Sequence, residues 1–374
     1  MTAPQPQPRS FLPRVRQVRC PSQIDGLPAE TARQLDAVAQ RYAFRANDYY
    51  LGLIDWDAPA DPIRRLVVPD MAELTPGGDL DASDEAANTV VQGVQHKYAD
   101  TALVLAADTC AAYCRYCFRK RLFMRQSAET AHDLSAAYAY VAHHPEITDV
   151  LLTGGDPLVL PTATLAVIVR RFAAMPHVRT VRIGSKMPAF NPYRLLDDES
   201  LHDLIAEVTA AGTAIYLMAH FDHPRELTDL ACNGVRAVQR AGAHVVNQCP
   251  LIRGINDDDE VLTELFEAAT ELGMPQYYLF QGRPTAGNAP YRVPLVRGWE
   301  LFDAARRRCS GLSRRVRFAM SHASGKVEVV GLDSERMYLR YHRALDPEDE
   351  SRLLVVRRDD GACWLDELVG MGGG

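Results

Sequence analysis

The sequence predicts an α/β fold in which a parallel sheet is covered by outer helices. From about residue 102 onward, short runs rich in β-branched residues alternate with segments whose apolar residues recur at helical spacing. Six such strand–helix units indicate either an open barrel or a doubly wound sheet. The predicted strands are Ala102–Ala107, Thr148–Thr153, Thr180–Gly184, Thr213–Ala219, His244–Gln248 and Gln276–Gln281, with a further strand at Val316–Met320.

Polar motifs follow these predicted strands one by one, at the point where each strand ends. Barrel enzymes build their sites at the C-terminal ends of successive parallel strands, so six such motifs in a row favour a barrel mouth over chance placement. In chain order the motifs are the cysteine loop 109–120, Thr153-Gly154-Gly155-Asp156, Gly184-Ser185-Lys186, His220-Phe221-Asp222-His223, Asn247-Gln248 and Gln281-Gly282-Arg283.

The segments on either side of this pattern differ from it. Glu30–Tyr42 is predicted to be an amphipathic helix, and prolines follow it at positions 59, 62 and 69. The Pro- and Gln-rich start, residues 1–9, lacks an apolar core and is expected to be a disordered lead-in. We therefore expect three parts, namely a helical cap or oligomer region at 1–95, the barrel at 96–330, and a C-terminal extension at 331–374. In and around the extension, strands are expected at Val327–Gly331, Met337–His342 and Leu353–Arg357.

Composition excludes several classes of protein. The 374 residues are 47% hydrophobic, which is enough for a large core, and no run of eighteen apolar residues indicates a membrane span. A formal charge of -7 disfavours nucleic-acid binding, which needs a basic face. Eight cysteines in a chain of this length do not form a disulfide framework, so we expect reduced thiols and a cytoplasmic protein.

Cys110, Cys114 and Cys117 are spaced so that three thiolates share one short loop. Three thiolates can hold three irons of a four-iron cluster and leave the fourth iron open to a small molecule. A structural zinc site would need a fourth Cys or His at a regular spacing, and the nearest histidines, His96 and His132, lie too far away. The loop therefore resembles the cluster-binding loop of radical S-adenosylmethionine (SAM) enzymes.

A longer set of motifs resembles the lysine 2,3-aminomutase family of radical SAM enzymes. The resemblance runs in order from about residue 45 to residue 300, and it implies a partial (β/α)6 barrel of the radical SAM type with an N-terminal helical region and a small C-terminal extension. The motifs that carry it are Tyr49-Tyr-Leu-Gly-Leu-Ile, Asp61-Pro-Ile-Arg-Arg, His96-Lys-Tyr-Ala-Asp, Cys114-Arg-Tyr-Cys-Phe-Arg-Lys-Arg, Leu152-Thr-Gly-Gly-Asp-Pro-Leu, Val181-Arg-Ile-Gly-Ser-Lys, His220-Phe-Asp-His-Pro-Arg-Glu and Asn247-Gln-Cys-Pro-Leu-Ile-Arg-Gly-Ile-Asn-Asp.

This resemblance implies an isomerase that moves an amino group between neighbouring carbons of an amino acid. Its cofactors would be the 4Fe-4S cluster, SAM and pyridoxal phosphate. In the family, the substrate amine forms an imine with pyridoxal phosphate, and a deoxyadenosyl radical from SAM takes a hydrogen from the β-carbon. The resemblance also implies a flavodoxin- or ferredoxin-like electron donor and a homo-oligomer.

Gly154, Gly155 and Asp156 are candidates for contacts to the amino group of SAM. Two glycines allow close approach of a ligand, and a carboxylate accepts from an ammonium. Ser185 and His220 are candidates for its carboxylate or ribose. The alternatives are an ordinary Gly-Asp turn and a packed polar histidine.

Arg119 matches the residue that family members use for the substrate α-carboxylate, a task that suits a planar bidentate donor. The alternative is a solvated arginine in the basic run 119–121.

Lys97 and Gln248 match family positions near the cofactor phosphate, whereas Thr101 stands where the family usually has a second phosphate-binding arginine. The family's imine-forming lysine follows a glycine run. Here the matching stretch, Ser321-His-Ala-Ser-Gly-Lys326, is shorter and holds one glycine. Lys326 is therefore the candidate catalytic lysine, and a lysine on a surface turn is the alternative.

Arg283 and Ser321 match positions at which lysine-specific members carry aspartates that bind the side-chain ammonium. An arginine in place of an aspartate reverses the sign of the pocket. Lysine is therefore disfavoured as substrate, and an acidic or neutral polar amino acid is expected, glutamate being the simplest.

Two other functions stay open from the sequence. A pyridoxal-independent radical SAM enzyme, such as a deaminating lyase or an epimerase, would explain Thr101 and the shortened glycine run. A non-enzymatic iron–sulfur protein would leave Gly154–Asp156 and the other motifs at the barrel mouth unexplained.

Overall fold

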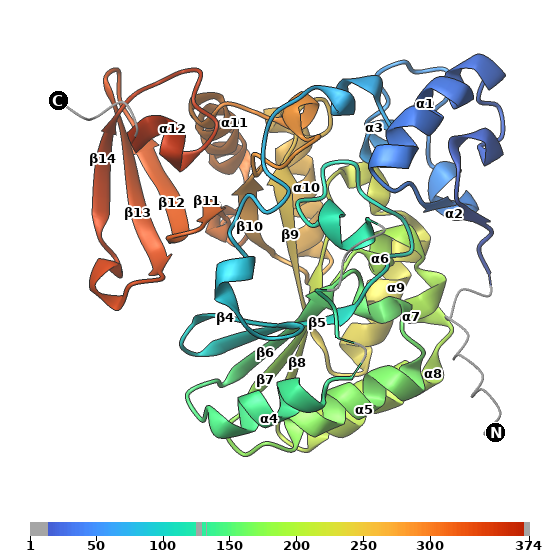
Figure 1. Cartoon of the computed structure of the whole chain (residues 1–374), viewed down its shortest axis with the longest axis vertical. Coiled ribbons are helices and arrows are strands. Elements are labelled where there is room, and N and C mark those ends of the chain that lie inside the picture. The colour runs from blue at the N-terminus through green and yellow to red at the C-terminus, as the bar shows by residue number, and fades with distance from the viewer. Residues whose placement is uncertain (1–13, 125–128, 132, 370–374) are drawn as a thin grey trace.

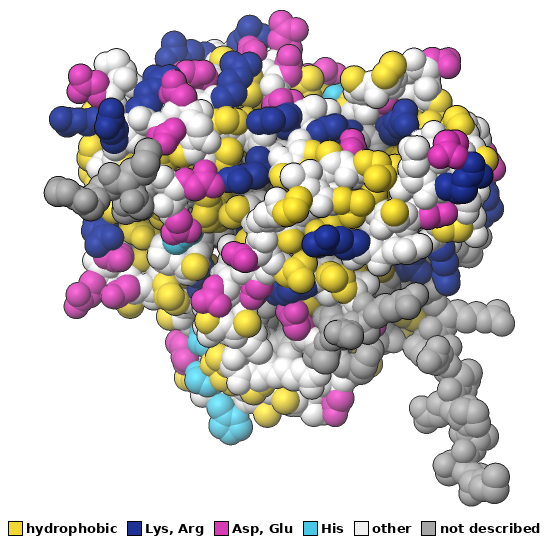
Figure 2. Space-filling model, turned by 45° about the horizontal axis from the view of Figure 1, so that its top comes forward, with side chains coloured by type: hydrophobic (Ala, Val, Ile, Leu, Met, Phe, Trp, Pro, Cys, Tyr) yellow, Lys and Arg dark blue, Asp and Glu magenta, His cyan; other side chains and the backbone are white. Residues whose placement is uncertain are grey.

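The computed structural model describes residues 14–124, 129–131 and 133–369 (Figure 1). The predicted lead-in at residues 1–9 lies outside these ranges. Within them, no helix is both long and apolar enough to cross a membrane. On the face shown in Figure 2, Lys and Arg side chains are interspersed with Asp and Glu, so this face has no continuous basic area of the kind that nucleic acids need.

A twelve-stranded sheet forms the centre of the molecule, with its strands in chain order from β3 at one edge to β14 at the other. Seven of these strands, β5 to β11, are parallel to one another. All seven predicted strands are confirmed. They are β5 (Thr101–Ala107), β6 (Asp149–Gly154), β7 (Thr180–Ser185), β8 (Ala214–Ala219), β9 (His244–Leu251), β10 (Gln276–Gln281) and β11 (Arg317–His322).

One strand end differs from the prediction. The fifth parallel strand was predicted to end at Gln248, with Asn247 and Gln248 as the polar motif at its end, but β9 continues to Leu251 and both residues lie in its interior. The buried Asn247 amide contacts the backbone of Phe221 at 2.8 and 3.0 Å and the side chain of Gln276 at 2.7 Å. Asn247 therefore holds neighbouring strand ends together, which its sequence position does not reveal.

Helices connect the parallel strands and pack their apolar faces on the sheet, as Leu165, Ile168 and Phe172 do in the second of them. Asp198, Thr228 and Asp258 begin three of these helices by accepting hydrogen bonds from backbone N–H groups of the first turn. The connecting helices are α4 (Ser135–His143), α5 (Thr162–Ala173), α8 (Glu199–Ala210), α9 (Asp229–Arg240), α10 (Asp259–Glu271) and α11 (Leu295–Arg308), with the short α6 (Met187–Phe190) and α7 (Tyr193–Leu196) between β7 and α8.

The N-terminal region lies beside the sheet, at the right of Figure 1. The predicted helix at Glu30–Tyr42 is confirmed as α1, with Leu35 and Val38 buried. The region comprises β1 (Gln17–Val18), α1 (Ala29–Arg41), β2 (Ala46–Asn47), α2 (Asp48–Leu51) and α3 (Pro62–Val67).

Antiparallel strands extend the sheet at both edges. The three strands predicted near the C-terminus are confirmed, and a hairpin that was not predicted precedes β5. The expected boundaries at 95/96 and 330/331 fall inside strands of this one sheet, so the division into three parts remains a prediction. These elements are β3 (Thr89–Val91), β4 (Val94–Tyr98), β12 (Gly325–Leu332), β13 (Arg336–Ala344) and β14 (Leu353–Arg357), followed by α12 (Leu365–Val369).

Side chains join the two ends of the sheet. Lys97 Nζ of β4 donates to the carbonyl oxygen of His322, the last residue of β11, at 2.5 Å. Arg343 of β13 pairs with Asp100, just before β5, at 2.5 Å. Because these residues belong to strands far apart in the sheet order, the sheet must curve back on itself. Its inner side encloses the cavity described next.

Candidate active site

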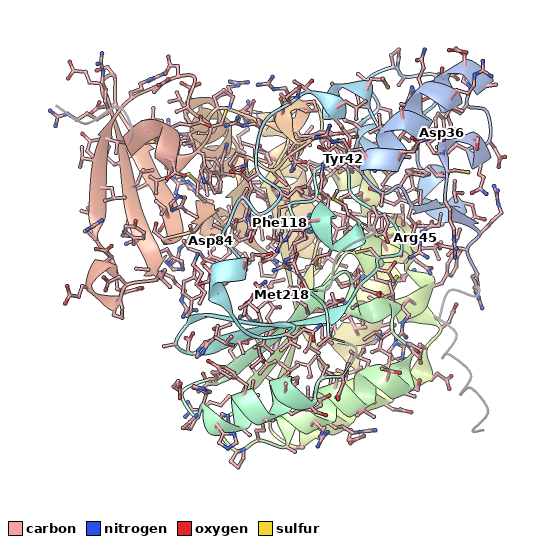
Figure 3. All side chains as sticks on the ribbon, viewed as in Figure 1. Asp36, Tyr42, Arg45, Asp84, Phe118 and Met218 are labelled. Atoms are coloured by element: carbon pink, nitrogen blue, oxygen red, sulfur yellow. The ribbon has the colours of Figure 1, made fainter. Side chains whose placement is uncertain are left out.

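One cavity of about 420 Å³ lies inside the curved sheet and extends from near the starts of the parallel strands, at Thr101 and Asp149, to the loops at their C-terminal ends. Phe118 and Met218, labelled in Figure 3, belong to its wall. Every residue that the sequence predicts for the site also lines this cavity. They are Lys97, Cys110, Cys114, Cys117, Arg119, Gly154, Gly155, Asp156, Ser185, His220, Gln248, Arg283, Ser321 and Lys326.

The cysteine loop follows β5 and is anchored to the N-terminal region. Arg115, between the second and third cysteines, is buried and forms an ion pair with the buried Glu73 at 2.7 Å. Its Nη1 donates to the carbonyl oxygen of Ala43 at 2.9 Å. Arg45 Nη1 donates to the carbonyl oxygen of Cys110 at 3.1 Å. The shape of this loop therefore depends on residues far upstream of the motif.

The three thiols of the loop fit an iron–sulfur cluster better than a single ion. Among the described residues, no three His, Cys, Asp or Glu side chains converge closely enough to hold one metal ion. In a four-iron cluster each thiolate binds a different iron, so such convergence is not required. Burial raises the pKa of Cys110, Cys114 and Cys117, so bound iron would have to supply the charge that stabilises their thiolates.

Gly154 and Gly155 allow the loop after β6 to pack on the cysteine loop. Gly155 N donates to Ala107 O at 2.7 Å, and Asp156 N donates to Thr109 O at 2.9 Å. A Cβ atom on Gly155 would collide with that Thr109 carbonyl, and Gly154 has a φ of 108°. Both positions therefore need glycine for reasons of packing and backbone conformation.

The carboxylate of Asp156 is already hydrogen-bonded within the protein. Its Oδ2 accepts from Ser185 Oγ at 2.9 Å and from the backbone N–H groups of Lys186 and Met187 at 2.9 and 3.0 Å. Its Oδ1 accepts from Leu158 N at 2.9 Å. Burial raises the pKa of Asp156, while these bonds act in the opposite direction. Asp156 therefore ties the ends of β6 and β7 together and fixes Ser185.

His220 belongs to a charged network behind the cysteine loop. Its Nε2 lies 3.0 Å from both Tyr116 Oη and Asp222 Oδ1. The buried Lys186 ammonium contacts Asp222 and Glu226 at 2.6 Å each. Burial would raise the pKa of Asp222, but Lys186 and His220 hold it well below its usual range. The sequence did not reveal the roles of Lys186, Asp222 and Glu226, although all three stand inside motifs that carry the family resemblance.

Arg119 is buried, so the alternative of a solvated arginine is wrong. Its Nε and Nη2 donate to the carboxylate of Glu85 at 2.6 to 3.1 Å, and its Nη1 donates to Thr153 Oγ1 at 3.0 Å. Arg121 pairs with the same Glu85 at 2.7 Å. Burial alone would raise the pKa of Glu85, but Arg119, Arg283 and Arg121 lower it to about 2. Glu85 was not predicted, because nothing in its local sequence distinguishes it.

Arg283 lies beside this group. Its guanidinium carbon is 3.6 Å from the ring centroid of Phe118. Its Nη1 is buried and has no hydrogen-bond partner among the described residues. Burial lowers the pKa of Arg283 to about 10, Arg119 acts in the same direction, and Glu85 opposes both. The cavity therefore holds a cation with unsatisfied donor capacity.

Lys326 is the second residue of β12, so the alternative of a surface turn is wrong. Its Nζ lies 4.6 Å from the ring centroid of Tyr278 and 5.9 Å from that of Phe280. Burial lowers the pKa of Lys326 to about 7, and Arg182 and Arg343 act in the same direction. An amine with this pKa is partly neutral near pH 7 and can act as a nucleophile.

Lys97 and Gln248 line the cavity from β4 and β9. Burial lowers the pKa of Lys97 to about 8, and Arg283 acts in the same direction. Thr101 is buried and donates to Asp100 Oδ1 at 2.8 Å, so it brings no positive charge to this part of the cavity.

Comparisons with known proteins agree with this geometry. A family model described as a 4Fe-4S single cluster domain matches residues 96–204, which hold the three cysteines and Gly154–Asp156. The class that this fold and loop define is the radical SAM enzymes. A solved structure of a radical SAM methyltransferase from Sphaerobacter thermophilus aligns with 60% of this chain and 68% of that one, at 20% identity and a TM-score of 0.41, which is too low to support an argument.

Curated relatives narrow the class to one family. A protein of Aquifex aeolicus named "Putative L-lysine 2,3-aminomutase" is 50% identical over 92% of this chain and 93% of its own length. The L-lysine 2,3-aminomutase of Clostridium subterminale is 34% identical over 70% of this chain and 62% of its own length. The glutamate 2,3-aminomutase of Clostridioides difficile is 28% identical over 80% and 70%, respectively. The chain belongs to the lysine 2,3-aminomutase family of radical SAM enzymes, which are isomerases.

Proposed function

We propose that this chain is a 2,3-aminomutase for an amino acid other than lysine, with an acidic or neutral polar side chain, and that glutamate is the simplest substrate. The observation that carries the proposal is the half-buried Arg283 in the cavity wall, whose buried Nη1 has no partner among the described residues. A carboxylate or carbonyl oxygen of the substrate would satisfy this donor. A lysine ammonium would instead meet a like charge in a poorly solvated site.

The substrate α-carboxylate would bind Arg119. Glu85 holds one edge of this guanidinium through Nε and Nη2, and Thr153 accepts from Nη1. A guanidinium has five N–H donors, so Arg119 keeps donors for a second carboxylate. Ser321, across the cavity wall, would contact the substrate side chain. An α-carboxylate on Arg119 and a second one on Arg283 would suit a dicarboxylic amino acid.

At the other end of the cavity, Cys110, Cys114 and Cys117 would hold the cluster, with SAM bound at its open iron. We propose Gly154, Gly155, Asp156, Ser185 and His220 as its contacts. Gly154 and Ser185 are the last residues of β6 and β7. Gly155 and His220 directly follow β6 and β8, so these four residues lie at strand ends beside the cysteine loop. Within the part of the chain that the structure describes, Asp156 Oδ1 accepts one bond, from Leu158 N, so this oxygen has capacity for a further donor.

Lys326, Lys97 and Gln248 fit pyridoxal phosphate. When bound, this cofactor supplies an aldehyde that links covalently to amines and a ring that delocalises an unpaired electron. Lys326 would offer the amine, because its pKa of about 7 leaves part of it neutral at physiological pH. Lys97 and Gln248 would donate to the phosphate. A pyridoxal-independent enzyme would leave the packing of Lys326 against aromatic rings unexplained.

The other parts of the proposal concern the whole protein. The contacts between the ends of the sheet support a partial (β/α)6 barrel, with residues 1–95 as cap or oligomer region and residues 331–374 as an extension. Reduced cysteines and an oxygen-sensitive cluster suit the cytoplasm. Reduction of the cluster would need a flavodoxin- or ferredoxin-like donor, and a homo-oligomer is proposed from the family.

Substrate selection by Arg283 tests the proposed function. Anaerobic enzyme with cluster, SAM and pyridoxal phosphate would be incubated separately with deuterated glutamate, glutamine and lysine, and deuterium in 5'-deoxyadenosine would be measured. Glutamate or glutamine should exchange faster than lysine. Arg283→Asp should shift the preference toward lysine by on the order of 2 kcal/mol, or about thirtyfold, as expected for a desolvated charge contact made or lost.

The matched control is Arg236→Asp, a charge reversal at an exposed arginine on α9, which should leave the preference unchanged. Preference of the wild-type enzyme for lysine would overturn the substrate proposal. Absence of a borohydride-sensitive absorbance band after addition of pyridoxal phosphate would favour the pyridoxal-independent alternative.

A further inference from the structure

Strand pairing places Arg343 next to Lys326. Lys326 of β12 lies directly opposite Arg343 of β13 and, on its other side, opposite Ser321 of β11. Residues directly opposite one another in antiparallel strands present their side chains on the same face of the sheet. All three residues line the cavity, so they form one row across its wall. The C-terminal strands thus bring a guanidinium beside the candidate catalytic amine.

Arg343 also reaches the other end of the sheet. Its Nη2 donates to Asp100 Oδ1 at 2.5 Å, and its guanidinium carbon lies 4.4 Å from the ring centroid of Tyr98. Thr101, the residue after Asp100, stands where the family usually carries a phosphate-binding arginine. Arg343 therefore brings a guanidinium from the far end of the chain into the neighbourhood in which that arginine is missing.

The charges around Lys326 favour an anion. Lys97, Arg182, Lys326 and Arg343 all line the cavity. Arg182 is paired with Asp149 at 2.8 Å. Neither Lys97 nor Lys326 forms an ion pair with a carboxylate among the described residues. The carboxylate of Asp100 is 54% exposed, so water screens its pair with Arg343. A guanidinium has five N–H donors, and its bond to Asp100 leaves donors for a second anion.

We infer that Arg343 is a further cofactor-binding residue, whose guanidinium binds the phosphate of pyridoxal phosphate in place of the arginine that Thr101 replaces. The inference rests on the proposed use of this cofactor by Lys326. It extends the site to β13, which completes a site that is otherwise built from the parallel strands, β4 and β12. Arginine suits this task because its planar fork matches phosphate oxygens.

The test compares two ligands that differ only in the phosphate. Pyridoxal phosphate and pyridoxal would be titrated separately into the cofactor-free full chain, and binding would be followed by the absorbance of the lysine-linked form. Arg343→Ala should raise the Kd for pyridoxal phosphate about tenfold or more, as expected for loss of a charge-assisted bond. The Kd for pyridoxal should change less than about twofold, because pyridoxal carries no phosphate. Inorganic phosphate should compete with pyridoxal phosphate in the wild type and less in the variant.

Arg340→Ala is the matched control, since Arg340 lies on the same strand and pairs with Glu328 at 2.6 Å but does not line the cavity. It should leave both Kd values unchanged. Arg343→Gln keeps the side-chain stem and a donor for Asp100, and it should behave like Arg343→Ala if the charge is what matters. Unchanged binding of pyridoxal phosphate by both Arg343 variants, or equal loss of both ligands, would overturn the inference. A wild-type chain that binds neither ligand would overturn the proposed cofactor use itself.

Discussion

The Lys326 amine is packed against aromatic rings, and the ion pairs of the described residues give it no carboxylate partner. Its nearest charged neighbours include Arg182 and Arg343, which repel a proton on the amine. An ammonium in such surroundings loses hydration without gaining a partner, which is why its pKa falls. The surroundings that make the Lys326 amine a suitable nucleophile therefore also destabilise the folded chain when this amine is protonated.

This cost gives a pH-dependent prediction for Lys326→Met in the cofactor-free protein. The folded chain releases the Lys326 proton near pH 7, whereas the unfolded chain holds it to its ordinary pKa of 10.5. Between these values the unfolded state binds more protons, so the wild type gains stability as pH rises. Lys326→Met should therefore unfold later than wild type at pH 7, by on the order of 1 kcal/mol or more, with the gain shrinking toward pH 10.

Denaturant titrations at several pH values would measure this difference, and the variant should also lack the borohydride-sensitive absorbance band. Arg236→Met, at an exposed position, serves as a control and should show no comparable pH trend. A difference in stability that stays constant from pH 6 to pH 10 would contradict the lowered pKa.

At the scale of elements, the loops after β5 and β6 behave as one unit. Two backbone hydrogen bonds, from Gly155 N and Asp156 N, join the loop after β6 to Ala107 and Thr109. The carboxylate of Asp156 then ties this loop to the end of β7. The cysteine loop is thus held by its neighbouring strand ends as well as by the residues within it.

Gly155→Ala should break this unit. A Cβ atom at position 155 would meet the backbone carbonyl of Thr109, which cannot move without displacing the cysteine loop. We expect destabilisation by about 2 kcal/mol or more, together with less iron bound per chain after reconstitution. Thermal unfolding of the cofactor-free chain and iron analysis would measure the two effects.

Gly311→Ala is the control for this change, because a Cβ atom there meets nothing within 4 Å. It should leave both the iron content and the stability close to wild type. If Gly155→Ala bound iron as well as the control does, the packing of the two loops would not govern the cluster site.

At the scale of the whole molecule, the N-terminal region and the C-terminal strands both take part in the site. The N-terminal region holds the cysteine loop through the buried pair of Glu73 and Arg115. The C-terminal strands contribute Lys326 and Arg343 to the cavity wall. The cavity therefore depends on three stretches of chain that the sequence suggested were separate parts.

Glu73→Gln tests the link between the N-terminal region and the site. Both side chains of the pair are almost fully buried, at 0% and 2% exposure, so the variant would leave the Arg115 charge without its partner. Loss of one partner from a buried pair costs about 3–5 kcal/mol. We expect early unfolding in denaturant and a cluster that is lost more readily.

The control is Glu207→Gln, which breaks a pair between Arg170 and Glu207 whose side chains are 52% and 54% exposed. An exposed pair contributes about 0–1 kcal/mol, so this variant should be nearly as stable as wild type. Equal effects of the two substitutions would mean that the buried pair does not anchor the loop.

The sequence by itself determined what depends on local spacing. The three cysteines, the seven parallel strands and the polar residues near the strand ends follow from patterns a few residues long, which are set by strand periodicity and by ligand geometry. Lys326 was also found from the sequence, because it is the only lysine between residue 187 and the C-terminus and it follows the last predicted parallel strand.

Only the tertiary structure decided which distant residues share the cavity. Glu85 meets Arg119 across 34 positions, and Arg343 meets Asp100 across 243 positions. Neither contact leaves a local pattern, because each depends on how the sheet curves and how its edge strands pair. The end of β9 was placed at Gln248 instead of Leu251 for the same reason, since the length of this strand is set by pairing with its neighbours and not by local sequence. Strand positions are encoded locally, whereas the partners of these charged side chains are fixed only by the tertiary fold.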